Sequence, residues 1–171
     1  FLRVSQIDPR IDRGDALLAK LCAVFSRIPY ENLTKIIKSD MVISPGSAKR
    51  LPDEVIEDYL RYGTGGTCFS LTAAFIAILN ALDIEAHPIL GDRHYGTDTH
   101  CALVFSQDAD LFLLDPGYLI NKPTRLPTVN PVTFSTGFNT IELRPHEVGH
   151  KVDLITIINN DRRYRLTYKI N

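Results

Sequence analysis

The chain of 171 residues is long enough for one domain with a hydrophobic core or for two small packed subdomains. Its formal net charge of −1 gives no electrostatic argument for binding nucleic acid or an anionic membrane surface. No apolar run approaches the roughly 20 residues that span a bilayer, and no signal-peptide pattern opens the chain. The three cysteines lack the spacing of a disulfide scaffold, which favours a reducing, cytoplasmic location.

Three helices are predicted in the first half of the chain. The first begins with Asp15 as its expected N-cap and ends before Pro29, because the apolar residues between them recur at helical spacing. A proline followed by two acidic residues predicts a second helix over 52–63. The third is expected over 68–82, where an apolar stripe follows the period of a helix.

Antiparallel strands are predicted in the second half, where short apolar segments alternate with turn residues. The expected strands span residues 86–90, 100–105, 111–114, 138–143, 152–158 and 164–170. Asn159-Asn160-Asp161 joins the last two as a hairpin turn, and three prolines make 121–137 a predicted long loop. Helices followed by strands indicate an α+β fold, with a helical subdomain at 1–83 and an antiparallel β-barrel at 84–171.

A cysteine stands where the third helix is expected to begin, in the run Gly65-Gly66-Thr67-Cys68-Phe69. Its sulfur would face unpaired backbone N–H groups and the positive end of the helix dipole, which both favour the thiolate. His100 and Asp115 follow in that order; a histidine can pair with a thiolate, and a carboxylate can fix the imidazole tautomer. Each residue alone also has a structural interpretation, but together they predict a cysteine-based acyl-transfer site. Cys22 and Cys101 are expected in the core.

Four blocks of sequence follow one another over roughly residues 17–118. They are Arg27-Ile28-Pro29-Tyr30-Glu31-Asn32-Leu33, Gly65-Gly66-Thr67-Cys68-Phe69, Thr99-His100-Cys101-Ala102-Leu103-Val104 and Leu114-Asp115-Pro116-Gly117-Tyr118. In order and approximate spacing they resemble the arylamine N-acetyltransferases, which carry Ile-Pro-Phe-Glu-Asn-Leu, Arg-Gly-Gly-x-Cys-Phe-Glu, a Thr-His strand and an Asp-Val-Gly-Phe strand. The resemblance implies the transglutaminase-like, cysteine-proteinase-like fold of that wider group.

The resemblance also implies a role for each residue. Cys68 would accept the acetyl group, His100 would act as its base, and Asp115 would orient His100. The implied acetyl donor is acetyl-CoA and the acceptor an arylamine or hydrazine nitrogen; no metal is implied, the expected partners are small molecules, and the oligomeric state stays open. The residues expected beside substrate and cofactor are Gly65, Gly66, Thr67 and Phe69. Glu31 and Asn32 are expected to support the wall of the site.

The sequence departs from the family pattern at three positions. Thr64 stands at the family's arginine, Ser70 at its glutamate and Pro116 at its valine. We therefore expect less charged support beside the nucleophile. The chain also stops at Asn171, where these transferases continue into a lid-like segment, so we expect that segment to be absent.

A competing motif, His146-Glu147-Val148-Gly149-His150, matches the H-E-x-x-H pattern of zinc metallopeptidases. That pattern binds zinc on a helix, whereas here it lies between two strand-like segments. In an extended chain the two histidines would be about 13 Å apart, too far for one ion. We interpret the motif as a polar hairpin connection, with a zinc metallopeptidase as a distant second possibility. A transglutaminase-like thiol hydrolase or transamidase with the same triad stays open as a function, and so does a non-catalytic interaction domain.

Overall fold

The computed structural model describes residues 1–42, 45–146 and 150–170. Its helices are α1 (Gly14–Phe25), α2 (Leu33–Met41), α3 (Pro52–Tyr62) and α4 (Cys68–Asn80), with a 3₁₀ turn η1 (Pro45–Ala48). Its strands are β1 (Ala86–Arg93), β2 (Gly96–Gln107), β3 (Asp110–Asp115), β4 (Ile120–Arg125), β5 (Val132–Ser135), β6 (Thr140–Pro145), β7 (Lys151–Ile158) and β8 (Asp161–Lys169). The predicted α+β class, with helices first and antiparallel strands after, is confirmed.

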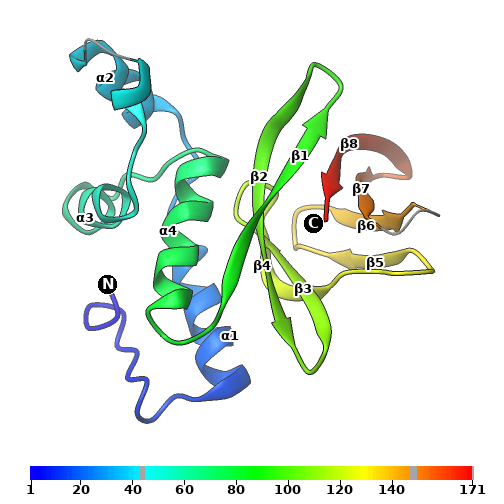
Figure 1. The fold of residues 1–171 in the computed structure, drawn as a ribbon, viewed down its shortest axis with the longest axis horizontal. Helices are drawn as coiled ribbons and strands as arrows, with labels where there is room; N and C mark the ends of the chain where they lie inside the picture. The colour runs from blue at the N-terminus through cyan, green and yellow to red at the C-terminus, as the bar shows by residue number, and fades with distance from the viewer. Residues whose placement is uncertain (43–44, 147–149, 171) are drawn as a thin grey trace.

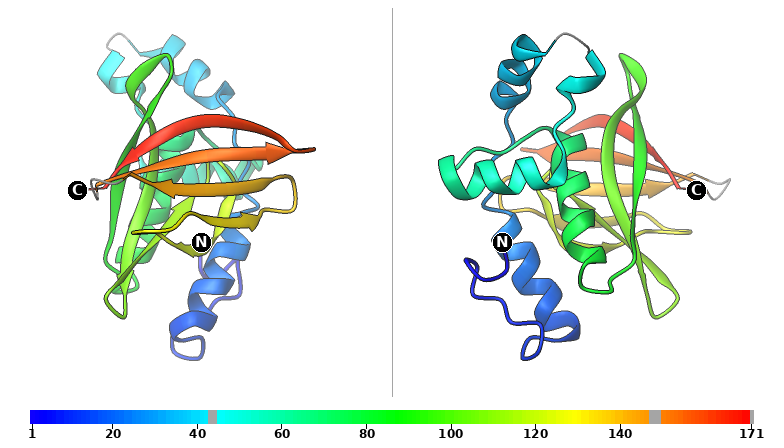
Figure 2. Two further views of the ribbon diagram at one scale, coloured as in Figure 1. Left: turned by 90° about the vertical axis from the view of Figure 1, so that its right-hand side faces the viewer. Right: turned by 60° about the vertical axis from the view of Figure 1, so that its left-hand side comes forward.

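The strands form one eight-stranded antiparallel sheet in the order β4-β3-β2-β1-β8-β7-β6-β5. Strands β1–β4 and β5–β8 each run as a meander, and the pairing of β1 with β8 joins the two halves. The sheet curls into a partial barrel (Figures 1 and 2). A cluster of buried apolar side chains fills its concave side, among them Leu113, Ile141, Leu154 and Leu166.

The helices gather on one side of the curled sheet, with α1 and α4 against it and α2 and α3 farther out (Figures 1 and 2). A second apolar cluster joins α1, α3 and α4 to β1, β2 and β3. At its centre the rings of Phe25 and Phe75 stack with centroids 4.2 Å apart. Burying such aromatic pairs stabilises the packing beyond their area alone, and this pair fixes α4 against α1.

The predicted loop over 121–137 is wrong, because it contains most of β4 and all of β5. The loop was predicted because three prolines fall in this range, but two of them lie where a strand tolerates proline. Pro123 lies within β4, which forms one edge of the sheet, and an edge strand tolerates a residue without a backbone N–H. Pro131 directly precedes β5, the other edge. The hairpin turn between the last two strands is confirmed, and Asn159 and Asn160 both adopt positive φ there.

Helix α2 was not predicted, and the start of α1 differs from expectation. None of the residues of α2 is buried, so it adds nothing to either apolar cluster. Arg13, rather than Asp15, occupies the N-cap of α1. Asp15 lies in the first turn, where its carboxylate accepts a hydrogen bond from Gln107 Nε2 (2.9 Å). In the ranges that the structure describes, no helix has the length and apolarity needed to cross a membrane.

Candidate active site

The chain just before α4 is held by a short parallel bridge between Tyr30 and Gly66. The Gly66 N–H donates to the Pro29 carbonyl at 3.2 Å. A Cβ on Gly65 would collide with the same carbonyl oxygen, so this approach requires glycine. The glycine pair therefore fixes the direction from which the chain enters α4 at Cys68.

Cys68 is the first residue of α4, where backbone N–H groups lack intrahelical acceptors and the helix dipole is positive. Thr72 lies one turn later, on the same face of the helix. Its hydroxyl donates to the Cys101 carbonyl on β2 at 3.1 Å. Because His100 precedes Cys101 on that strand, this bond fastens α4 to the strand that carries the histidine.

Asp115 ends β3 and is fully buried, and four donors surround its carboxylate. His100 Nε2 lies 2.7 Å from Oδ2, and the Tyr168 hydroxyl donates to the same oxygen at 2.5 Å. The backbone N–H groups of Gly117 and Tyr118 donate to Oδ1 at 2.8 and 3.1 Å. The expected contact between Asp115 and one His100 ring nitrogen is thus present, and the carboxylate holds the imidazole in place.

The space beside Gly117 is where the three predicted residues meet. A Cβ built on Gly117 would lie 2.8 Å from His100 Cε1, 3.1 Å from Cys68 Cβ and 3.2 Å from Asp115 Oδ1. Side chains from α4, β2 and β3 therefore converge on one point. The structure brings Cys68, His100 and Asp115 together as the sequence predicted.

The electrostatics of Cys68 and His100 favour an ion pair. Burial raises the pKa of the Cys68 thiol, but a hydrogen bond with His100, the charge of His100 and the Cys101 backbone N–H lower it more, and the pKa falls below its ordinary value. Burial lowers the pKa of His100, yet the neighbouring Asp115 carboxylate and the Cys68 thiolate raise it to about 9. Each group of the pair thus favours the charged form of the other.

The other two cysteines lie in the opposite environment. Burial raises the pKa of the Cys22 thiol to about 12, and burial together with the charge of Cys68 raises the pKa of the Cys101 thiol to about 12. Both side chains lie in the core, as expected. Cys68 is the cysteine that the fold prepares to act as a thiolate.

Arg50, which no sequence motif indicated, supports the segment before Cys68. Its guanidinium is almost fully buried and donates to the Gly65 carbonyl, to Thr34 Oγ1 (2.6 Å) and to Asp58 Oδ2 (2.6 Å). In the same network the Glu31 carboxylate accepts a hydrogen bond from the Thr34 hydroxyl, and Glu31 Oε1 lies 3.9 Å from Arg50 Nη1. The expectation of weak charged support beside the nucleophile is therefore wrong, because an arginine from another segment supplies it.

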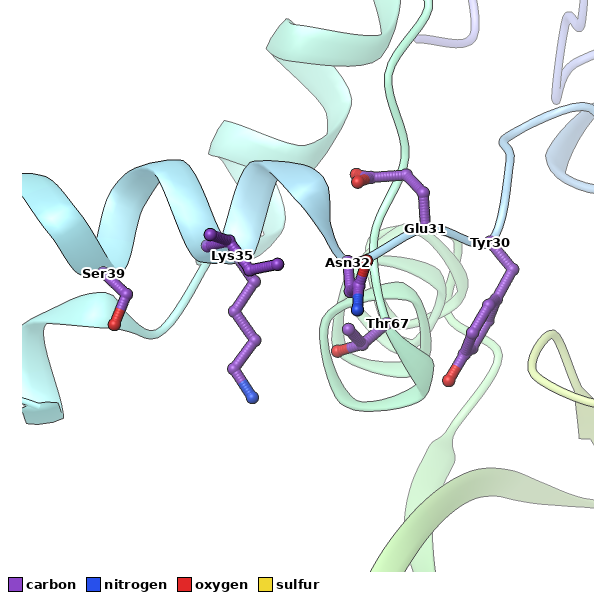
Figure 3. A pocket seen from close by; sticks show the side chains of 7 residues that line it. Tyr30, Glu31, Asn32, Lys35, Ser39 and Thr67 are labelled. Carbon is purple, nitrogen blue, oxygen red and sulfur yellow. The ribbon is translucent and has the colours of Figure 1, made fainter.

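The other predicted residues surround the entrance to α4. Thr67 and Asn32 line a cavity of about 570 Å³ next to the nucleophile's helix. Gly66 pairs with Tyr30 in the bridge and Gly65 directly precedes it, while Phe69 is exposed on the first turn of α4. Figure 3 shows Tyr30 and Lys35 pointing to the same side of this cavity, with the Glu31 carboxylate turned away. The lining residues are Tyr30, Glu31, Asn32, Lys35, Ile36, Ser39 and Thr67.

Two more side chains at the triad were not predicted. Tyr168 lies on β8, and strand alternation indicates only that it faces the barrel interior, not that its hydroxyl reaches Asp115. Arg93 ends β1, and its guanidinium reaches His100 Nδ1 at 2.9 Å. Neither contact follows from a local pattern, because each depends on which strands become neighbours.

The H-E-x-x-H motif lies between β6 and β7 rather than on a described helix. The His146 N–H donates to the Lys151 carbonyl, and His146 Nε2 lies 2.8 Å from Asp153 Oδ1. His150 directly precedes β7, and Glu147 lies outside the described residues. Among the residues that are described, no group of three or more histidine, cysteine, aspartate or glutamate side chains is arranged to hold a metal ion.

No protein-family model and no curated protein matches the chain. Solved structures do match it. The arylamine N-acetyltransferase of Mycobacterium abscessus superposes with a TM-score of 0.76 at 21% identity, over 99% of this chain and 62% of that one. This chain has the arylamine N-acetyltransferase fold. The fold implied by the sequence blocks is thereby confirmed.

Two further arylamine N-acetyltransferases extend the comparison. The Salmonella typhimurium enzyme matches with a TM-score of 0.70 at 19% identity, over 99% of this chain and 62% of that one. A Bacillus cereus enzyme described as having a Cys-His-Glu catalytic triad matches with a TM-score of 0.73 at 16% identity, over 99% and 68%. The chain spans roughly two thirds of the length of these N-acetyltransferases, and aspartate stands as the third member of its own Cys-His-Asp cluster.

Proposed function

We propose that the protein transfers an acetyl group from acetyl-CoA to an arylamine or hydrazine nitrogen, through an acetyl-Cys68 intermediate. One observation carries this proposal: Cys68, His100 and Asp115 converge beside Gly117, on a fold shared with the arylamine N-acetyltransferases. The lowered pKa of Cys68 and the raised pKa of His100 supply the nucleophile and the proton donor that such a reaction needs.

In the first step the Cys68 thiolate attacks the thioester carbonyl of acetyl-CoA. A carbon–sulfur bond forms to Cys68, the bond to the coenzyme sulfur breaks, and the His100 imidazolium protonates the departing thiolate. Backbone N–H groups in the first turn of α4 lack intrahelical acceptors and are positioned to stabilise the developing oxyanion. The step leaves an acetylated cysteine and a neutral imidazole.

In the second step the acceptor amine attacks the acetyl-cysteine carbonyl. The now neutral His100 takes the proton from the attacking nitrogen, and the carbon–sulfur bond to Cys68 breaks. Asp115 keeps the imidazole oriented throughout, because its carboxylate is held by two backbone N–H groups and the Tyr168 hydroxyl. Ping-pong kinetics follow from this covalent intermediate.

Intact-mass analysis after incubation with acetyl-CoA tests the proposal. We expect one acetyl adduct in the unmodified protein, none in Cys68→Ser, and one in the matched control Cys101→Ser. Adding an aromatic amine or hydrazine should discharge the adduct and yield the acetylated amine. Discharge by water alone, with no acetylated amine, would favour a thiol hydrolase, and an unacetylated Cys68 would contradict acetyl transfer.

A further inference from the structure

Arg93 contacts the catalytic histidine on the side away from Asp115. The guanidinium Nη2 lies 2.9 Å from His100 Nδ1, while His100 Nε2 lies 2.7 Å from Asp115 Oδ2. A guanidinium only donates hydrogen bonds, so Nδ1 must accept in this contact. The proton of the ring is then on Nε2, directed at Asp115. The contact with Arg93 therefore favours the neutral imidazole in one defined tautomer, whereas the charges of Asp115 and the Cys68 thiolate favour the imidazolium.

The charge of Arg93 is not paired with a carboxylate in the part of the chain that the structure describes. Its Nη1 donates to the Tyr95 hydroxyl at 2.5 Å, and its Cζ lies 5.8 and 5.6 Å from the ring centroids of Tyr95 and Tyr118. Its Nε is buried and has no hydrogen-bond partner among the described residues. Aromatic faces and phenol groups hold the guanidinium in place without cancelling its charge.

Arg93 and Cys68 use the same nitrogen of His100. Asp115 occupies Nε2, so the proton exchanged with the thiol must pass through Nδ1. Protonating Nδ1 sets an N–H against the N–H of Arg93, which opposes formation of the imidazolium. The same guanidinium charge stabilises a thiolate on the neighbouring sulfur, and the charge of Cys68 in turn raises the pKa of Arg93.

We propose that Arg93 is a positioning residue, which favours the neutral Nε2–H tautomer of His100 against the opposing charge of Asp115 and stabilises the Cys68 thiolate by its charge. The consequence for acetyl transfer rests on the proposed function, because discharge of acetyl-Cys68 requires a neutral His100 to accept the amine proton. Arg93 thus favours the second step, whereas Asp115 favours the imidazolium of the first. The opposing effects of the Arg93 and Asp115 charges on the pKa of His100 set the pH at which both steps proceed.

The test measures alkylation of Cys68 by iodoacetamide, a neutral reagent, as a function of pH. In a His100→Gln background, where the charge of His100 no longer acts on Cys68, adding Arg93→Gln should move the midpoint of the rate profile to higher pH by about 1 unit, because a nearby positive charge has been removed. Arg93→Lys keeps the charge and should recover most of the shift. Arg61→Gln is the matched control, since Arg61 also lies over a tyrosine ring, that of Tyr62, but on α3.

A second measurement reads the tautomer directly. In a Cys68→Ala background, ¹⁵N spectra of the histidine rings recorded above the pKa of His100 should show the neutral, Nε2-protonated tautomer, and adding Arg93→Gln should raise that pKa by about 1 unit. An unchanged alkylation midpoint together with an unchanged tautomer would overturn the proposal. So would a loss of rate confined to the anionic reagent iodoacetate, which would make Arg93 an anion-binding group instead. Neither measurement uses acetyl-CoA, so a failure of acetyl transfer is distinguishable from a failure of this inference.

Discussion

Two candidate sites that contain histidine differ in how deeply the fold buries them. At the first, Cys68, His100 and Asp115 come from α4, β2 and β3 and meet in the interior, where His100 and Asp115 are fully buried. At the second, His146 lies in the connection between β6 and β7, and its side chain is 42% exposed. The residues of a short motif can form a site only if the local structure points their side chains to the same place. Residues that are far apart in the sequence form a site only when the packing of the whole fold brings them together.

Burial explains why His100 and His146 lie in different electrostatic environments. Charges in the interior are poorly screened, so the buried Asp115 carboxylate, 2.7 Å from His100 Nε2, helps to raise the pKa of His100 to about 9. The pair of His146 and Asp153 has a similar length, 2.8 Å, but water reaches it. Exposed pairs of this kind contribute about 0–1 kcal/mol. Substitutions at the first site should therefore have larger effects than a substitution at His146.

The largest expected effect is the selectivity of thiol alkylation. Cys68 should be the only cysteine that iodoacetamide modifies rapidly at neutral pH in the folded protein, because its pKa is lowered. The pKa of about 12 at Cys22 and Cys101 leaves a thiolate fraction on the order of 10⁻⁵ at neutral pH. Peptide mapping after timed labelling gives the three rates. Similar rates at all three cysteines would contradict an activated thiol at the first site, and labelling under denaturing conditions provides the control.

A slightly smaller loss is expected from Gly117→Ala. The added methyl group would press on the His100 ring, the Cys68 Cβ and the Asp115 carboxylate at once. Displacing reacting groups by about 1 Å can cost on the order of 10²-fold in rate, so both the alkylation rate of Cys68 and acetyl-enzyme formation should fall by about that factor. Gly96→Ala is the matched control, because a Cβ there meets only the Cγ2 of Thr99, the end of a side chain. Equal rates in Gly117→Ala and the unmodified protein would show that the three side chains have room to move apart.

These contrasts also explain what the sequence could and could not predict. Residue type and order along the chain predicted Cys68, His100 and Asp115, because each stands in a recognisable block. Arg93 and Tyr168 carry no such pattern, since they reach the site only when β1 packs beside β2 and β8. Tertiary pairing cannot be read from local periodicity.

The same argument applies to the fold. Apolar residues at helical spacing predicted α1 and α4, a proline with two acidic residues predicted α3, and short apolar segments between turn residues predicted most of the central strands. Strands β4 and β5 were hidden by prolines that only an edge position tolerates, and position in a sheet is a property of the assembled fold. Helix α2 buries none of its residues, so packing against the core does not select the apolar spacing that would have predicted it.

A stability effect of intermediate size is expected at Arg50, which connects the segment before Cys68 to α2 and α3. Arg50→Met should lower the free energy of unfolding by about 2–4 kcal/mol, because it removes charged hydrogen bonds and leaves the Gly65 carbonyl without its donor. Arg50→Lys keeps one charge but cannot reproduce the fork of contacts, so about half of that loss should remain. Urea unfolding measures both.

The matched control for Arg50 is Arg10→Met, since Arg10 pairs with Asp8 at 2.7 Å on the surface. Its side chain is almost fully exposed, so its removal should leave the free energy of unfolding nearly unchanged. If Arg50→Met cost no more than this control, Arg50 would be a surface-like ion pair rather than the support of the nucleophile's segment.

The smallest expected effect is at the second histidine site, and it tests the interpretation of the H-E-x-x-H motif as a connection. His146→Ala should change the free energy of unfolding by less than about 0.5 kcal/mol, as is usual for surface positions, and should leave the alkylation rate of Cys68 unchanged. His87→Ala is the matched control, because His87 is also exposed and also lies near a carboxylate, that of Glu85 (3.3 Å).

Zinc would require two histidine nitrogens about 2 Å from one ion, while His146 Nε2 is engaged by Asp153 and the His146 N–H is fixed to Lys151. Elemental analysis of the purified protein should therefore find no stoichiometric zinc, and a chelator should leave thermal unfolding unchanged. About one zinc per chain, lost in His146→Ala but kept in His87→Ala, would make the H-E-x-x-H motif a metal site and favour a metallopeptidase instead.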